Sequence, residues 1–266
     1  MAQTVAILSQ KGGTGKTTSV RTLTDVFRRV GIETLAVDLD PQGNLSDYFD
    51  LEPDVSPTVG DVLTGRAGIE DALHDGIVPA NLGLAETELV LGGKMGRELA
   101  LRRALAGLSE RYELILIDCP PSLGLLTVNA LVAADHALIS AEAQYFAMQG
   151  VEQAKEVIDL ARDGLNSELN WLGVVFNIAD MRTVHSREAY ASLREHYGER
   201  LFDTTIRASI AYAESAERAV SILDYRPDLA TDYLAVSEEL LKRLGMEGPR
   251  RKVRALAGEA AGARVT

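Results

Sequence analysis

Two lysines and several glycines stand together near the N-terminus, in the run Gln10-Lys11-Gly12-Gly13-Thr14-Gly15-Lys16-Thr17-Thr18. Glycines let backbone N–H groups turn inward around phosphate oxygens, and a following helix adds its positive N-terminal end. In such a loop Lys16 reaches the β- and γ-phosphates, and the Thr17 hydroxyl ligates Mg²⁺. The run therefore predicts a phosphate-binding loop. The common G-x-x-x-x-G-K-S/T pattern would need glycine at Gln10, so a plain glycine-rich turn is the alternative.

Aspartates follow two of the apolar runs. Asp118 ends the apolar run 114–117, where a buried carboxylate is costly unless it has a partner. A water-bridged Mg²⁺ would supply that partner, and an aspartate that caps the next helix is the alternative. Asp40 follows Asp38 by two residues, so on an extended chain both side chains point to one face. A plain β-turn over residues 40–43 is the alternative there.

The elements that must position these residues alternate between short apolar runs and segments of helical period. This pattern predicts an α/β fold, a mostly parallel β-sheet flanked by helices in a single domain. We expect strands at 5–9, 34–38, 114–117, 136–140 and 172–177, and helices at 16–30, 96–109, 125–133, 148–161, 184–197 and 231–244. Residues 50–93 are expected to be irregular, with prolines and glycines around short helical pieces. The domain should span residues 1–247, and residues 248–266 should form a basic, disordered tail.

Composition excludes several classes of protein. The 266 residues include 27 Lys and Arg, 39 Asp and Glu, and one cysteine, with a net charge of −12. Cys119 alone cannot form an internal disulfide or a thiolate metal cluster, and the four histidines lack zinc-ligand spacing. No apolar run approaches the roughly 20 residues of a membrane span, so we expect a cytoplasmic protein. Residues 242–266 carry +5, which leaves −17 on residues 1–241.

Four stretches of the chain resemble one known family. The loop at 11–18 resembles the deviant Walker A loop of the ParA/MinD group of P-loop ATPases, with Lys11 as its signature lysine. VDLDPQGNLS at 37–46 resembles the ParA switch I, and LILIDCPPS at 114–122 resembles its Walker B strand and switch II. TIRASIAYAES at 205–215, followed by SILDY at 221–225, is similar to the ParA C-terminal block. The resemblance implies a P-loop NTPase fold, and the DxDPQGN run is typical of ParA rather than MinD.

The resemblance also implies roles for individual residues in binding and hydrolysing ATP with Mg²⁺. Lys11, Lys16 and Asp40 would be catalytic, because Lys11 reaches across a dimer to the partner's nucleotide and Asp40 positions the attacking water. Thr17, Asp40 and Asp118 would form the metal site, with Asp38 near the magnesium shell. Asn177 would contact adenine, and a loop asparagine satisfied by the protein itself is the alternative. The nucleotide-binding set is Lys11, Gly12, Gly13, Thr14, Gly15, Lys16, Thr17, Thr18, Asp118 and Asn177.

Partners follow from the same resemblance. We expect an ATP-dependent homodimer that binds nucleoid DNA without sequence preference, and a ParB-like or adaptor protein that stimulates hydrolysis. The cargo would be a plasmid, a chromosome or a protein assembly. Candidate DNA contacts are Arg182, Arg187, Arg207 and Arg218, with the basic tail as a second candidate. Arginines paired with neighbouring acids are the alternative, and the net charge opposes long-range attraction to DNA.

Two other classes remain open at this stage. A MinD-like membrane-associated ATPase would need a C-terminal amphipathic helix with a large apolar face. Residues 248–266 are poor in large apolar side chains, which disfavours that reading. A metabolic or kinase P-loop enzyme is the third class.

Overall fold

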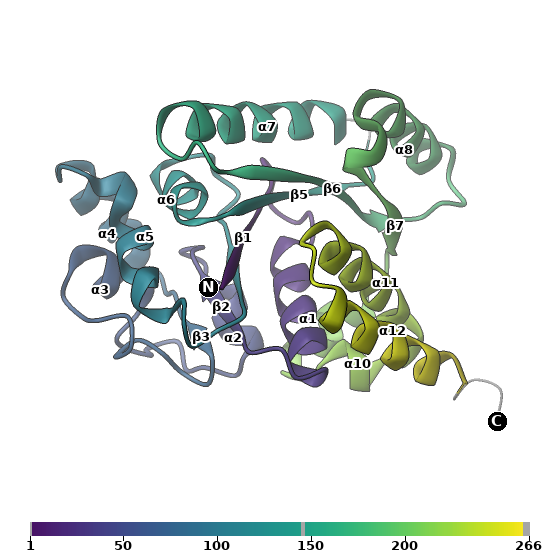
Figure 1. The fold of residues 1–266 in the computed structure, drawn as a ribbon, viewed down its shortest axis with the longest axis horizontal. Coiled ribbons are helices and arrows are strands. Elements are labelled where there is room, and N and C mark those ends of the chain that lie inside the picture. The colour runs from purple at the N-terminus through teal and green to yellow at the C-terminus, as the bar shows by residue number, and fades with distance from the viewer. Residues whose placement is uncertain (1, 145–146, 263–266) are drawn as a thin grey trace.

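Seven parallel strands form one sheet in a computed structural model that describes residues 2–144 and 147–262 (Figure 1). The strand order is β3-β2-β4-β1-β5-β6-β7. The strands are β1 (Gln3–Leu8), β2 (Thr34–Asp38), β3 (Ile77–Val78), β4 (Leu114–Asp118), β5 (His136–Glu142), β6 (Asn170–Ala179) and β7 (Leu201–Arg207). The predicted α/β class, a single domain with a mostly parallel sheet flanked by helices, is confirmed.

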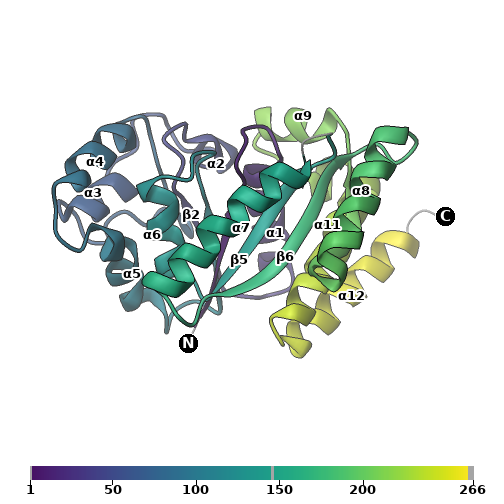
Figure 2. The ribbon, with the colours of Figure 1, turned by 90° about the horizontal axis from the view of Figure 1, so that it is seen from above.

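Helices cover both faces of the sheet, as Figures 1 and 2 show. One apolar core packs beneath α3 (Val59–Thr64), α4 (Gly83–Gly92), α5 (Ala100–Leu105), α6 (Leu125–Ala133), α7 (Ala147–Gly164) and α8 (Val184–Tyr197). The other core packs beneath α1 (Lys16–Arg29), α2 (Asn44–Tyr48), α9 (Ala211–Glu217), α10 (Ile222–Tyr225), α11 (Pro227–Arg243) and α12 (Glu247–Gly262). Because both faces are covered, β2 and β4 are buried at every position, as their continuous apolar runs predict.

The carboxyl ends of the central strands meet at one edge of the sheet. Asp38 at the end of β2 pairs in register with Asp118 at the end of β4, and Ile7 of β1 pairs with Asp118. The loop 9–15 leaves the end of β1 and leads into α1. This arrangement brings the predicted phosphate loop and both aspartates to the edge where open parallel sheets bind ligands.

The region expected to be irregular around short helical pieces contains two short helices and one strand that was not expected. Residues 50–93 hold α3, β3 and α4, although the two-residue β3 gives little periodic signal. The helix expected at 96–109 is divided into the 3-10 turn η1 (Arg97–Leu99), α5, and the 3-10 turn η2 (Ala106–Leu108). A further 3-10 turn, η3 (Gly198–Arg200), leads into β7, a strand that the sequence analysis missed.

The C-terminal segment differs from the expected disordered tail. Residues 247–262 form α12, whose Val253 is fully buried and whose Leu256 and Ala257 pack against the core beneath α11. Pro249 lies in the first turn of the helix, where its missing N–H breaks no helical hydrogen bond. Arg250 and Arg254 both pair with Glu238 of α11. These contacts hold in a helix a segment whose few apolar residues suggested disorder. Residues 263–266 lie outside the described residues.

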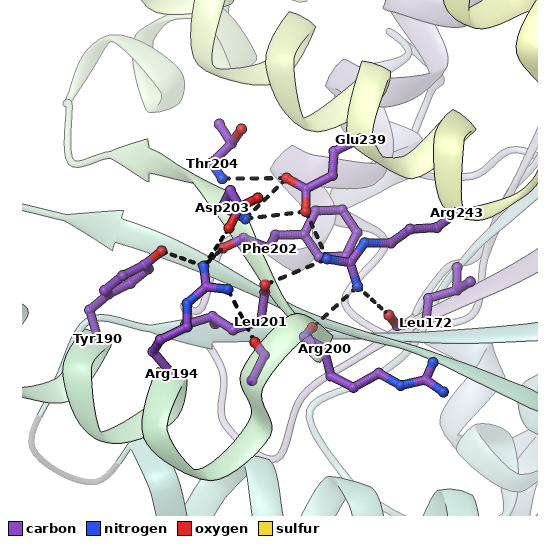
Figure 3. A network of polar contacts seen from close by, with 11 residues as sticks. Leu172, Tyr190, Arg194, Arg200, Leu201, Phe202, Asp203, Thr204, Glu239 and Arg243 are labelled. Carbon is purple, nitrogen blue, oxygen red and sulfur yellow. Dashed lines mark hydrogen bonds and ion pairs between the residues drawn. The ribbon is translucent and has the colours of Figure 1, made fainter.

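The edge strand β7 is covered by α11 (Figure 3). The Glu239 carboxylate accepts hydrogen bonds from the backbone N–H of Asp203, at 3.1 Å, and of Thr204, at 3.4 Å. Arg243 pairs with Glu239 at 2.7 Å and donates to the Leu172 carbonyl at 2.8 Å. The free backbone groups of an edge strand can pair with another chain. The bonds to Glu239 occupy two backbone N–H groups of β7 and also hold α11 in place.

Candidate nucleotide site

The loop between β1 and α1 has the backbone that its glycines predict. Gly13 and Gly15 adopt φ values of +75° and +77°, in the left-handed region that disfavours other residues. Ser9 donates from Oγ to the Lys11 carbonyl at 2.7 Å, and Thr14 donates from Oγ1 to Ser9 Oγ at 2.9 Å. The loop is therefore an ordered turn, held by its own hydroxyl groups, that precedes the N-terminus of α1.

The two lysines of the loop lie in different environments. Lys16 is only 5% exposed, and its Nζ donates to Ser9 Oγ at 2.9 Å and to the Lys11 carbonyl at 3.1 Å. Burial lowers the pKa of Lys16, and the charge of Asp118 acts in the opposite direction. Lys11 is exposed at the surface of the loop. The same short loop thus presents one ammonium group inward and one outward.

The paired aspartates differ in how their charges are compensated. Asp38 accepts hydrogen bonds from the backbone N–H of Ser46 at 2.9 Å, from Ser46 Oγ at 2.8 Å and from the backbone N–H of Asp40 at 3.1 Å. Both carboxylate oxygens of Asp118 are buried and form no hydrogen bond of ordinary length among the described residues, although the Thr17 hydroxyl and the Lys16 ammonium lie close enough to favour the charged form. Burial, and then the neighbouring Asp38 charge, raise the pKa of Asp118 well above its usual range.

The Asp118 carboxylate is compensated only in part, by Thr17 and Lys16, and it fits a site for a cation. A buried charge is costly unless it is paired or close to a metal. Mg²⁺ commonly takes one or two carboxylates together with substrate phosphates and water, so Asp118 and the nearby Thr17 hydroxyl are suitable donors. Among the residues that the structure describes, no three His, Cys, Asp or Glu side chains converge as a metal cluster.

Asp40 lies beyond the end of β2, in a turn. Its Oδ1 accepts from the Gln42 N–H at 3.0 Å, and its carbonyl accepts from the Gly43 N–H at 3.0 Å. The turn predicted as the plain alternative is therefore present. Asp40 also lines the cleft beside the loop, which Asp38 does not, so the expected shared face of the two carboxylates is not what the turn produces.

A cleft of about 460 Å³ lies beside the loop. Its lining comprises Gly12, Gly13, Gly15, Lys16, Thr17, Thr18, Asp40, Gln42, Asn44, Tyr48, Pro121, Asn177, Ile178, Arg207, Ala208, Ser209, Tyr212, Ala213 and Tyr233. Tyr212 and Tyr233 pack edge to face, with ring centroids 5.7 Å apart. The sequence analysis missed both tyrosines and Tyr48, because nothing in their local sequence marks them as neighbours of the loop. Polar groups on one side and aromatic rings nearby suit a ligand with a phosphate end and a planar end.

Comparison with known proteins assigns the chain to a family. The family described as "AAA domain" matches residues 2–171. The chromosome partitioning protein ParA of Myxococcus xanthus is 34% identical over 258 residues, which cover 94% of this chain and 91% of that protein. The sporulation initiation inhibitor protein Soj of Bacillus subtilis is 33% identical over 90% of this chain and 98% of that protein. The chain belongs to the ParA/Soj family of P-loop ATPases.

Solved structures agree with the sequence relatives. A Cyanothece McdA–ATP complex is 26% identical and superposes with a TM-score of 0.81, covering 90% of this chain and 96% of that one. Cobyrinic acid a,c-diamide synthase from Mycobacterium smegmatis, with bound ATP analogue and magnesium, is 36% identical with a TM-score of 0.75, covering 82% and 93%. Ligands of both kinds, adenine nucleotides and magnesium, are therefore bound by proteins of this fold.

In this ParA/Soj family member, Asn177 at the end of β6 braces the loop. Its buried Nδ2 lies within hydrogen-bond distance of the Gly15 carbonyl, at 3.3 Å, of Ser19 Oγ, at 3.1 Å, and of Ser140 Oγ, at 3.3 Å. Tyr233 of α11 joins this network through Ser19, at 3.2 Å between the hydroxyl oxygens. Asn177 also lines the cleft, and its predicted contact with adenine stays a prediction.

The four arginines expected to contact DNA have local partners. Arg182 pairs with Asp180 at 2.8 Å, and Arg187 donates to the Arg182 carbonyl at 2.7 Å. Arg207 pairs with Asp232 at 2.8 Å, and the Arg218 guanidinium lies 5.3 Å from the centre of the Tyr225 ring. Arg207 also lines the nucleotide cleft, a placement that the sequence analysis did not foresee.

Proposed function

We propose that this ParA/Soj family ATPase binds ATP and Mg²⁺, dimerises, and then holds nucleoid DNA without sequence preference. A ParB-like or adaptor partner stimulates hydrolysis, and the resulting cycle of binding and release positions a plasmid, a chromosome or a protein assembly. The observation that carries the proposal is the joining of the ordered loop, Asp40 and the buried Asp118 at one edge of the sheet, beside a 460 Å³ cleft. The protein would act in the cytoplasm, on the nucleoid.

The residues of the cleft divide the chemistry between them. Lys16 exchanges its bonds to Ser9 and the loop carbonyl for the β- and γ-phosphates of ATP, which are stronger acceptors. Thr17 and Asp118 would hold Mg²⁺, which would supply positive charge to the phosphate oxygens. Asp40, in its turn at the cleft, orients the attacking water.

Lys11 supports the dimer. It is exposed on the loop surface, whereas Lys16 points into the loop. A second molecule that docks over the cleft would bring its own Lys11 to this molecule's phosphates. A compact ammonium group suits that task better than the planar guanidinium of arginine.

Basic residues on several segments of the chain would contact DNA. Of the predicted arginines, Arg182 has a side chain that is 91% exposed, against 50% for Arg207. On α12, Arg251 and Lys252 are exposed and stand on an ordered helix. A local basic surface can bind phosphate in a chain of charge −12, because charges more than about 10 Å away are largely screened at 0.1 M salt.

A membrane-bound cycle is less well supported. The apolar residues of α12 pack against the protein, with Val253 fully buried, so they do not offer a free face to lipid. None of the described helices combines the length and the apolar character needed to cross a bilayer.

Two assays test the proposal together. Light scattering and DNA mobility shift are measured with and without Mg-ATP, on the wild type, Lys11→Ala and Lys16→Ala. The wild type should dimerise and bind duplex DNA only with ATP, Lys11→Ala should bind ATP as a monomer, and Lys16→Ala should not bind ATP. Dimers of Lys11→Ala would contradict the role across the interface. An ATP-bound wild-type dimer that floats with anionic liposomes and ignores DNA at 50 mM salt would favour the membrane cycle.

A further inference from the structure

A second hollow, far from the nucleotide cleft in the fold, lies between α3, α4 and α5. It encloses about 470 Å³ and shares no lining residue with the nucleotide cleft. Figures 1 and 2 place these three helices at one end of the molecule, with α11 and α12 toward the other. The floor is apolar and includes Leu63, Ile69, Leu91 and Ala104. We refer to it as the α3–α5 groove.

The rim of the α3–α5 groove is positively charged. Its lining includes Lys94, Arg97 and Arg103 and contains no carboxylate, in a chain where acids outnumber bases by 39 to 27. Lys94 donates to the Thr64 carbonyl at the end of α3, at 2.9 Å, and none of the described carboxylates forms an ion pair with Lys94 or Arg103. Arg97 is paired with Glu98, at 2.9 Å. Two of the three cations therefore keep their charge available to a ligand.

The segment 82–95, which supplies Leu91, Lys94 and Met95 to the groove, also carries exposed apolar side chains. Met95 is 99% exposed and lines the groove, whereas Leu89, Leu82 and Val90, which are 81%, 71% and 54% exposed, do not line it. These four belong to residues 82–95, on α4 and its flanks, and they are four of the nine large apolar side chains most exposed in the described part of the chain. Clustered exposed apolar residues commonly mark a site for another protein.

We propose that the α3–α5 groove docks a short segment of a partner protein in which one or two large apolar side chains are flanked by carboxylates. The apolar floor and Met95 would bury the side chains, and Lys94 and Arg103 would pair with the acids. A nucleic acid backbone has no apolar group for this floor. A concave groove also suits a projecting side chain better than the plane of a bilayer. The proposal goes beyond the ATPase cycle and does not depend on it.

An unbiased selection tests this. A phage library of random dodecamers is panned on immobilised full-length protein without nucleotide, and enriched peptides are measured by fluorescence anisotropy. The enriched peptides should combine Leu, Ile, Phe or Met with an excess of Asp and Glu. Arg103→Glu and Lys94→Glu should each weaken their binding at least tenfold, since a charge-assisted contact contributes about 1.5–3 kcal/mol.

Arg102→Glu is the matched control, because Arg102 is the exposed neighbour of Arg103 on α5 and does not line the groove. It should leave peptide binding within about twofold, and melting curves should show all three variants folded. No enrichment, enriched peptides without an acidic excess, or equal losses in Arg102→Glu and Arg103→Glu would each overturn the proposal. So would anionic vesicles that bind with the same dependence on Lys94 and Arg103. ATP turnover should be unchanged in every variant, which separates this result from the fate of the proposed function.

Discussion

Asp118→Asn should stabilise the nucleotide-free protein, although it removes a residue of the nucleotide site. In the structure the Asp118 carboxylate is completely buried and pairs in register with the buried Asp38. Thr17 and Lys16 favour its charged form, but burial and the Asp38 charge outweigh them and raise its pKa. Each unit by which folding raises the pKa of a carboxyl group costs about 1.4 kcal/mol of stability once the group is ionised, and asparagine removes that cost. Burial of the asparagine amide offsets part of that gain. We therefore expect a net gain of about 2 kcal/mol.

The measurement is the melting temperature at pH 7.5. For a chain of this size 1 kcal/mol corresponds to roughly 2 °C, so the variant should melt about 4 °C higher without nucleotide. In saturating Mg-ATP the wild type should instead melt at a higher temperature than Asp118→Asn. A ligand at 1,000 times its Kd stabilises by about 4.1 kcal/mol, and the variant should receive much less of this because its cation site is impaired. Asp54→Asn, at an exposed position, is the control and should change neither value.

The effect of Asp118→Asn on stability should depend on pH. Burial raises the pKa of Asp118 in the folded protein above the ordinary value of 3.8, so the folded state binds this proton more tightly than the unfolded chain does. Stability of the wild type is then lost as pH rises from about 4 through the raised pKa. The advantage of Asp118→Asn should be absent near pH 4 and should grow as pH rises toward the raised pKa. A lower melting temperature for the nucleotide-free variant at pH 7.5 would refute the reasoning, because it would mean that Thr17 and Lys16 stabilise the carboxylate by more than its burial destabilises it.

Three further substitutions test other parts of the structure. Asp40→Ala should still bind ATP and dimerise, while steady-state phosphate release falls by roughly 10² or more, as for loss of a positioned general-base group. Asn177→Ala removes the amide that braces Gly15 and Ser19, and calorimetric titration should show ATP affinity reduced about tenfold with the fold intact. Glu239→Ala leaves Arg243 unpaired and uncovers the backbone N–H groups of β7. Denaturant unfolding should show a loss of about 2–3 kcal/mol, against little change for the exposed Glu195→Ala.

The sequence by itself predicted the phosphate loop and the central sheet. The loop requires only neighbours in the chain, because glycines at 12, 13 and 15 permit its backbone and Lys16 follows directly. The buried strands are short apolar runs, since helices cover them on both sides. Asp118 was recognisable for the same reason, as a charge at the end of such a run. These features are local, so a local pattern is sufficient evidence for them.

Segments at the margins of the fold were harder to recognise. β7 lies at the edge of the sheet, and Asp203 and Arg207 are among its exposed residues, so it lacks the continuous apolar pattern of a central strand. α12 has few large apolar residues, and it is ordered because Val253 meets the core formed with α11. In both cases the stabilising partner comes from elsewhere in the chain.

The tertiary structure alone decided how the far side of the nucleotide cleft is built. Tyr212, Tyr233 and Arg207 lie about two hundred residues from the loop in sequence, and they reach it because β7 and α11 pack against β6 and α1. The same packing gave Arg207 an ion pair with Asp232 and placed it at the cleft, where the sequence suggested a DNA contact. Side-chain surroundings of this kind depend on long-range packing, which no pattern of neighbouring residues encodes.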